Sequence, residues 1–189
     1  MTCSSADCSQ RRFGDSDFCL AHHPESAEVI EQHRELIRRE PVLRDLVVPL
    51  LKLDGIDFSH KTLIDCDFHG ASLHNCQFSE TRMTFCLFDH ASFAHCKFHE
   101  AKILESVLAG SRIADCEFSV SDAIQCNFNG CQTFGARFMA CDLMYSRFLS
   151  IQGDALSFED CNLKSVHFNA PCPDWISFTY SNKEDALFI

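Results

Sequence analysis

The sequence predicts an all-β solenoid, a chain that coils into stacked turns around a narrow core. Three observations predict it: phenylalanine recurs every ten residues, a second apolar series lies halfway between, and 18 Phe stand against 2 Tyr and 1 Trp in 189 residues. Such a repeat organises the whole chain, so its interpretation precedes any other. The phenylalanines of the series are Phe58, Phe68, Phe78, Phe88, Phe98, Phe118, Phe128, Phe138, Phe148, Phe158, Phe168, Phe178 and Phe188.

The repeating unit is five residues long, because mostly aliphatic residues such as Leu63, Leu73 and Ile103 alternate with the phenylalanines. This spacing fits neither the period of a helix nor that of a strand. A chain that turns every fifth side chain inward must bend after each unit. Two units per turn leave no interior for phenylalanine, so we expect four units and about 20 residues per coil, with coils stacked at ~4.8 Å.

A small residue usually stands two positions before the centre of each unit, and it is often cysteine, as at Cys76 and Cys96. Small size suits a second inward position beside a bulky one. Stacked coils hold such cysteines at the ~4.8 Å strand spacing, which exceeds the Cβ separation of a disulfide. We therefore expect buried free thiols that act as small apolar side chains.

Units such as CDFHG, ASLHN, CQFSE, ASFAH, CKFHE and CNFNG resemble the pentapeptide repeat family, whose loose consensus is A(D/N)LXX. In this chain Phe and Cys replace much of the family's Leu and Ala. The resemblance covers residues 54–170 and implies a right-handed quadrilateral β-helix of about six coils with four pentapeptides in each.

Both ends of a solenoid need covering, because their faces would otherwise be open to water. We expect residues 24–53 to form an α-helical N-terminal cap. Pro24 suits a first helical turn and is followed by apolar residues on one face, and Pro41 starts a second apolar segment that ends or kinks near Pro49. Residues 171–189 break the repeat and are expected to form an irregular last coil or cap.

Residues 1–23 contain a C-x4-C-x10-C-x2-H pattern that resembles a zinc knuckle. Three thiolates and one imidazole are the donor set of a closed tetrahedral zinc site, and a segment without an apolar core needs such a metal to fold. We expect a structural Zn²⁺ without an open position for catalysis; the alternative is a disordered tail. The ligand set is Cys3, Cys8, Cys19 and His22, with His22 preferred over His23 because of its spacing.

Composition and charge exclude several classes of protein. A net charge of -11 argues against direct binding of nucleic acid or an anionic membrane. No apolar run reaches the ~18 residues of a membrane span. The first residues, MTCSSADCSQRR, contain no hydrophobic signal region, so we expect a cytoplasmic protein. No nucleotide-binding, hydrolase or metalloprotease motif occurs, so an enzyme is not expected.

One side of the predicted rod carries apolar residues that point outward over several coils. A continuous apolar stripe usually marks an interface, and a homodimer is its simplest form. The alternative is that the C-terminal segment, with Trp175 and Tyr180, covers the stripe. The expected partner-binding residues are Ile64, Phe85, Leu104, Ile124, Met144 and Tyr145.

These features favour a non-enzymatic scaffold that binds a protein partner, or itself, through the stripe. The family resemblance implies an alternative, since Qnr and mycobacterial quinolone-resistance proteins look like B-form DNA and act on DNA gyrase, which makes a gyrase- or topoisomerase-binding DNA mimic a candidate. A DNA mimic needs outward rows of acidic residues, and here such rows are interrupted by Lys97, Arg137 and Arg147. A second alternative is a regulatory adaptor that recognises a protein through the zinc knuckle, whose only basic pair is Arg11 and Arg12.

Overall fold

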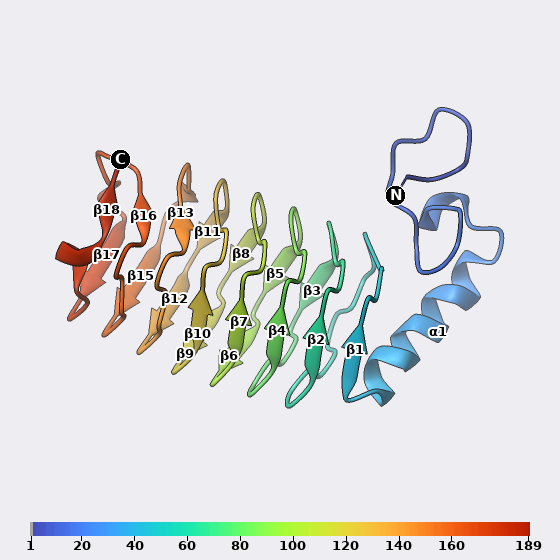
Figure 1. The fold of residues 1–189 in the computed structure, drawn as a ribbon, viewed down its shortest axis with the longest axis horizontal. Coiled ribbons are helices and arrows are strands. Elements are labelled where there is room, and N and C mark those ends of the chain that lie inside the picture. The colour runs from blue at the N-terminus through green and yellow to red at the C-terminus, as the bar shows by residue number, and fades with distance from the viewer. Residues whose placement is uncertain (1) are drawn as a thin grey trace.

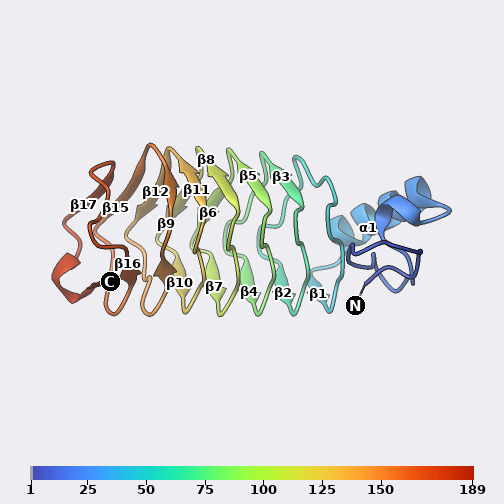
Figure 2. The same ribbon diagram turned by 90° about the horizontal axis from the view of Figure 1, so that it is seen from above.

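The computed structural model describes residues 2–189, which form a parallel β-solenoid of about 7 turns with one α-helix at its N-terminal end (Figure 1). Each strand pairs with the strand one coil later, Val42 with Thr62 and Thr62 with Arg82, so a coil takes about 20 residues. The predicted right-handed quadrilateral β-helix is confirmed, with one coil more than the resemblance implied. Figure 2 shows the rod from above, with the N-terminal segment beyond its first coil.

Four stacks of short strands form the faces of the rod, numbered in the order in which the chain crosses them. The first face contains β1 (Val42–Arg44), β2 (Thr62–Ile64), β4 (Arg82–Thr84), β7 (Lys102–Leu104) and β10 (Asp122–Ile124). The second contains β13 (Arg147–Phe148), β16 (His167–Phe168) and β18 (Leu187–Phe188). The third contains β3 (Ser72–His74), β5 (Ser92–Ala94), β8 (Arg112–Ala114), β11 (Gln132–Phe134) and β14 (Gln152–Gly153). The fourth contains β6 (Lys97–His99), β9 (Glu117–Ser119), β12 (Ala136–Met139), β15 (Leu156–Glu159) and β17 (Ile176–Thr179).

The core consists of two phenylalanine stacks, one behind the second face and one behind the fourth. On the fourth face, the rings of Phe98 and Phe118 lie 4.3 Å apart between centroids and within 7° of parallel. On the second face, Phe128 and Phe148 lie 4.5 Å apart. Leu108, the one break in the phenylalanine series, is 2% exposed and keeps its place in the second stack. The ten-residue alternation therefore determines the packing, as predicted.

The small inward residues have a role that size alone did not predict. Their side chains donate hydrogen bonds to carbonyls of the preceding coil: Cys96 Sγ lies 2.7 Å from the oxygen of Leu73, and Ser111 Oγ lies 2.7 Å from that of Phe88. The repeat cysteines are free thiols. Burial raises the pKa of Cys126 to about 12, so its thiol stays protonated and can donate. Cysteine, serine and threonine share this slot because each is small and each carries a donor.

The expected helical cap over 24–53 is wrong in its second half. The only α-helix among residues 2–189 is α1 (Ser26–Arg39), and β1 follows it directly and pairs with β2. Leu43, Val48 and Leu53 point inward at five-residue spacing and are at most 3% exposed. The apolar residues after Pro41 fit a helical face as well as a coil, but a proline at 49 is unfavourable inside a helix and the five-residue register continues through it.

Lys61 joins the helix to the coil. It occupies an inward slot that holds small residues in later coils, and it is 9% exposed. Its ammonium donates to the carbonyl oxygens of Arg38 at 3.0 Å and Glu40 at 2.9 Å. These are carbonyls at the C-terminal end of α1, where a positive charge is favourable. The buried ammonium group therefore has hydrogen-bond acceptors, and two carbonyls at the end of α1 have a donor.

The C-terminal residues 171–189 form an irregular last coil. β17 pairs with β15 and β18 pairs with β16, so the fourth and second faces continue to the end. The third face stops at β14, and the short 3-10 helix η2 (Lys183–Asp185) precedes β18. Within residues 2–189 no helix combines the length and apolar character that a membrane span requires.

Val120 stands at the corner between the fourth and first faces, 56% exposed and with a φ of 53°. This left-handed conformation is costly for a β-branched residue. Replacing Val120 by glycine is therefore expected to raise the free energy of unfolding by about 1 kcal/mol, because relief of strain exceeds the entropy that glycine adds to the unfolded chain. Urea unfolding of the variant and of the wild type measures this change in the free energy of unfolding. Ala123→Gly, at a buried inward position nearby, should destabilise; equal losses for both variants would contradict the strain argument.

Candidate metal centre and protein-binding face

The N-terminal loop brings the four expected metal ligands together. The backbone N–H of Cys3 donates to the carbonyl of Gln10 at 2.8 Å, which closes the first half of the loop. Cys19 directly precedes the 3-10 helix η1 (Leu20–His22), whose single turn places His22 next to it. The ligand atoms of the cluster lie within 4.8 Å of one another, and its members are Cys3, Cys8, Cys19 and His22.

The distances in this cluster match those of a tetrahedral zinc site. Zn–S bonds of ~2.3 Å and Zn–N bonds of ~2.0 Å at tetrahedral angles separate two sulfurs by about 3.8 Å and a sulfur from a nitrogen by about 3.5 Å. Cys8 Sγ and Cys19 Sγ lie 3.9 Å apart. His22 Nδ1 lies 3.4 Å from Cys19 Sγ and 3.6 Å from Cys3 Sγ. The sulfurs are too far apart for a disulfide and suitably placed for one shared metal ion.

Local hydrogen bonds favour the thiolate form of Cys3. Burial acts to raise the pKa of Cys3, but backbone hydrogen bonds at Cys19 and Ser5 and a side-chain bond to His22 together lower it to about 6. A thiolate is the form of cysteine that binds metal. His23 lies outside the cluster, and its Nδ1 accepts a hydrogen bond from the backbone of Glu25 at 3.2 Å.

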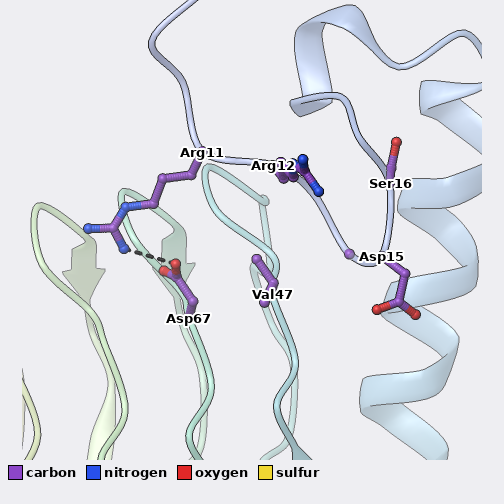
Figure 3. A pocket seen from close by; sticks show the side chains of 7 residues that line it. Arg11, Arg12, Asp15, Ser16, Val47 and Asp67 are labelled. Atoms are coloured by element: carbon purple, nitrogen blue, oxygen red, sulfur yellow. Dashed lines mark hydrogen bonds and ion pairs between the residues drawn. The ribbon is translucent and has the colours of Figure 1, made fainter. Parts of the chain in front are cut away.

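The N-terminal loop is attached to the rod by one buried ring and one arginine. Phe13 is fully buried and packs edge-on against His33 of α1, 4.8 Å between ring centroids. Arg11 reaches the second face, where its guanidinium lies 2.9 Å from Asp67 (Figure 3). The same guanidinium lies 3.1 Å from Asp89. Asp89 also contacts His69 Nδ1 at 2.7 Å.

These attachments escaped the sequence interpretation, in which Arg11 was simply a basic residue of the knuckle. Arg11 and its partners are 56 and 78 positions apart in the chain, and no periodic pattern relates them. The clustering of carboxylates on the second face in the first coils was the only available signal. In the structure, Arg11 and Arg12 line a shallow pocket between the loop and the rod together with Val47 (Figure 3).

The predicted apolar stripe lies on the exit side of the first face. Backbone register stacks Ile64, Thr84, Leu104 and Ile124 on one another, and Met144 follows through the hydrogen bond from Gln125 N–H to its carbonyl at 2.9 Å. All five stacked side chains are half-buried. We call this row together with the two corner residues that follow it, Phe85 and Tyr145, the apolar ladder. Phe85 and Tyr145 are 49% and 51% exposed.

The C-terminal segment does not cover the apolar ladder. Trp175 is half-buried against the core of the last coil, and Ile176 pairs with Leu156 on the fourth face. Tyr180 is 86% exposed at the corner beyond that strand. The segment stacks on the end of the rod (Figure 1), so the ladder remains open along its length in the described chain.

Comparison with known families identifies the type of repeat. The family model described as Pentapeptide repeats, present in 8 copies, matches residues 52–84. The matched segment contains the first three phenylalanines of the series, Phe58, Phe68 and Phe78. The chain contains pentapeptide repeats.

Solved structures of pentapeptide repeat proteins share the fold. A trypsin-treated variant of QnrB1, described as a plasmid-mediated fluoroquinolone resistance protein, aligns with 15% identity and a TM-score of 0.50, covering 74% of this chain and 81% of its own. HetL, described as involved in heterocyst differentiation regulation in the cyanobacterium Nostoc sp. strain PCC 7120, aligns with 12% identity and a TM-score of 0.30, covering 85% and 93%. A comparison with curated protein sequences gives no match. At 15% identity, the likeness to QnrB1 concerns the fold alone.

Proposed function

We propose that this pentapeptide repeat protein is a non-enzymatic, cytoplasmic scaffold that binds a protein through the apolar ladder. The observation that carries the proposal is the half-buried row on the first face, which the C-terminal segment leaves open. The row is apolar except at Thr84. Contiguous apolar surface in contact with water is unfavourable and marks interaction sites. The fourth face, by contrast, carries polar or charged side chains at its outward positions from Asp57 to Thr179, except at Met139.

Two exposed aromatic residues support this assignment. Phe85 and Tyr145 occupy corner positions with φ of 56° and 63°, a left-handed conformation that most corners of this rod share. Their side chains are 49% and 51% exposed. Aromatic rings contribute strongly to protein interfaces.

The cluster of Cys3, Cys8, Cys19 and His22 is proposed to hold one structural Zn²⁺. Four protein ligands complete a tetrahedral shell, so the ion would stabilise the loop and offer no open position to a substrate. Through Phe13 and Arg11 the folded loop then fastens onto the N-terminal end of the rod. This arrangement gives less support to the adaptor hypothesis, because Arg11 is already engaged by the rod.

DNA mimicry directed at gyrase is the second candidate function. It is favoured by the rod shape, by the net charge of -11 and by the fold shared with a fluoroquinolone resistance protein. On the fourth face, however, Lys97, Glu117 and Arg137 alternate in register, which interrupts any phosphate-like row. Inhibition of gyrase supercoiling that persists in a Leu104→Asp variant would favour this alternative over the ladder.

A photo-crosslinking residue placed at Leu104 tests the proposed function in the cell that makes the protein. We expect it to form crosslinks to protein, because Leu104 lies at the middle of the ladder. The same residue placed at Ser119, which is half-buried at the equivalent outward position of the fourth face, serves as the control. Equal crosslinking at both positions, or none at Leu104, would count against the proposal.

A further inference from the structure

The charges on the first face change sign halfway along the apolar ladder. The outward row at the start of its strands runs Arg82, Lys102, Asp122, Asp142 in direct register, two basic residues followed by two acidic ones. Lys102 and Asp122 face each other at 3.9 Å within the chain. Among the ion pairs of residues 2–189, Arg82 and Asp142 form none. This charge row runs parallel to the apolar row and on the same face.

We propose that the partner of this face is a second copy of the same chain, in an antiparallel homodimer. The inference rests on the proposed function, since it names the occupant of the apolar ladder. A twofold axis that lies in the face, along the strands and between β7 and β10, reverses the order of the coils and leaves each outward row opposite itself. The start of the charge row is then opposite its end.

This symmetry pairs the four charges of the charge row with opposite charges and the central apolar residues with each other. Lys102 meets Asp122 of the second copy and Arg82 meets Asp142, twice each because the axis repeats every contact. In the apolar row Leu104 meets Ile124 and Thr84 meets Met144. At the corner, the exposed ring of Phe85 lies opposite the exposed ring of Tyr145 of the second copy. Complementary charges steer such a pairing and specify its register.

Other symmetric arrangements of the same face are unfavourable. An axis along the rod keeps the chains parallel and places the charge row on the apolar row, so that Lys102 would rest on Leu104 and Asp122 on Ile124 without partners. A shift of the antiparallel arrangement that centres the axis on β7 brings Lys102 against Lys102, and one centred on β10 brings Asp122 against Asp122. Like charges at an interface are strongly disfavoured.

The size of the face predicts a weak and salt-sensitive dimer. Five coils at ~4.8 Å make a strip about 19 Å long, which is short for a standard interface of roughly 800 Å² per partner. The ion pairs lie along the edge of the strip, where salt screens them. The dimer should therefore dissociate on dilution and more readily at high ionic strength.

Charge exchange tests the register as well as the existence of the dimer. Sedimentation velocity from about 1 µM to about 500 µM should show the wild-type chain shifting from monomer to dimer. One double variant, R82D with K102D, makes the row wholly acidic, and another, D122K with D142K, makes it wholly basic. Each alone should associate at least about 100-fold more weakly than wild type, and an equimolar mixture of the two should recover a heterodimer.

A matched control uses the fourth face, where K97D with R137D should leave self-association unchanged. Circular dichroism melting of each variant shows that the rod is intact. A wild-type chain that stays monomeric at all concentrations overturns the homodimer, as does a dimer that persists in both double variants or variants that do not recover on mixing. If the homodimer fails while Leu104 still crosslinks to a different protein, the proposed function stands; if Leu104 crosslinks to nothing, both fail.

Discussion

Replacing Cys19 by serine is expected to abolish the binding of one Zn²⁺ per chain and to loosen the N-terminal loop from the rod. Cys19 is 2% exposed, and its sulfur touches both Cys8 Sγ at 3.9 Å and His22 Nδ1 at 3.4 Å. Serine supplies no thiolate, and three remaining ligands bind zinc far more weakly. Structural zinc contributes on the order of 10 kcal/mol to the folding of such small segments, which is more than the contacts of Phe13 and Arg11 can replace.

Metal content of the purified protein and limited proteolysis measure the two parts of this prediction. Wild type should carry one zinc per chain and resist cleavage before α1, whereas Cys19→Ser should carry none and be cleaved there. Cys76→Ser is the matched control, because Cys76 is a buried repeat thiol that donates to Leu53 at 3.0 Å and serine can replace that donor. A wild-type protein that takes up no zinc, or a Cys19→Ser variant that retains it, contradicts the assignment of the metal centre.

Replacing Phe118 by alanine is expected to lower the free energy of unfolding by about 3–5 kcal/mol. Its ring is 1% exposed and lies between two others, 4.3 Å from Phe98 and 4.4 Å from Phe138. Removing it leaves a cavity that the rigid coils cannot collapse around, and it breaks two aromatic contacts at once. The loss falls in the middle of a solenoid, where neighbouring coils depend on each other.

Urea unfolding followed by circular dichroism measures this loss. Phe85→Ala is the control: it deletes the same ring at a corner that is 49% exposed, and the change in stability should stay within about 0.5 kcal/mol at a concentration where the chain is monomeric. Equal destabilisation by the two substitutions would show that the stacked phenylalanines are not what holds the coils together.

The periodic part of the molecule was predictable because its contacts repeat. A five-residue unit that alternates Phe with aliphatic residues strongly favours a four-sided coil. The positions of Phe98, Phe118 and Leu108 in the stacks follow from that register. The cluster of Cys3, Cys8, Cys19 and His22 was predictable for a related reason, since the side-chain chemistry of these residues and their short spacing within one loop restrict what they can do. The outward position of Leu104 and Ile124 likewise follows from the register of the coil.

The tertiary structure decided the features in which one unique residue meets another. The first coil starts at Val42 because Pro49 opposes a helix and β1 can pair with β2, and this pairing is available only once the rod exists. Lys61 closes the end of α1, Arg11 joins the N-terminal loop to Asp67, and the thiols donate to carbonyls of the preceding coil.

The physical reason for this division is the nature of each contact. Sequence by itself determined the contacts between equivalent positions of successive coils. Because the pattern repeats every 20 residues, the position of one residue also gives the position of the residue that stacks on it in the next coil. Contacts between the N-terminal segment and the rod join residues without any repeating relation, such as Arg11 and Asp89. Their distances depend on where the whole chain has already packed, so only the folded structure brings the two partners together.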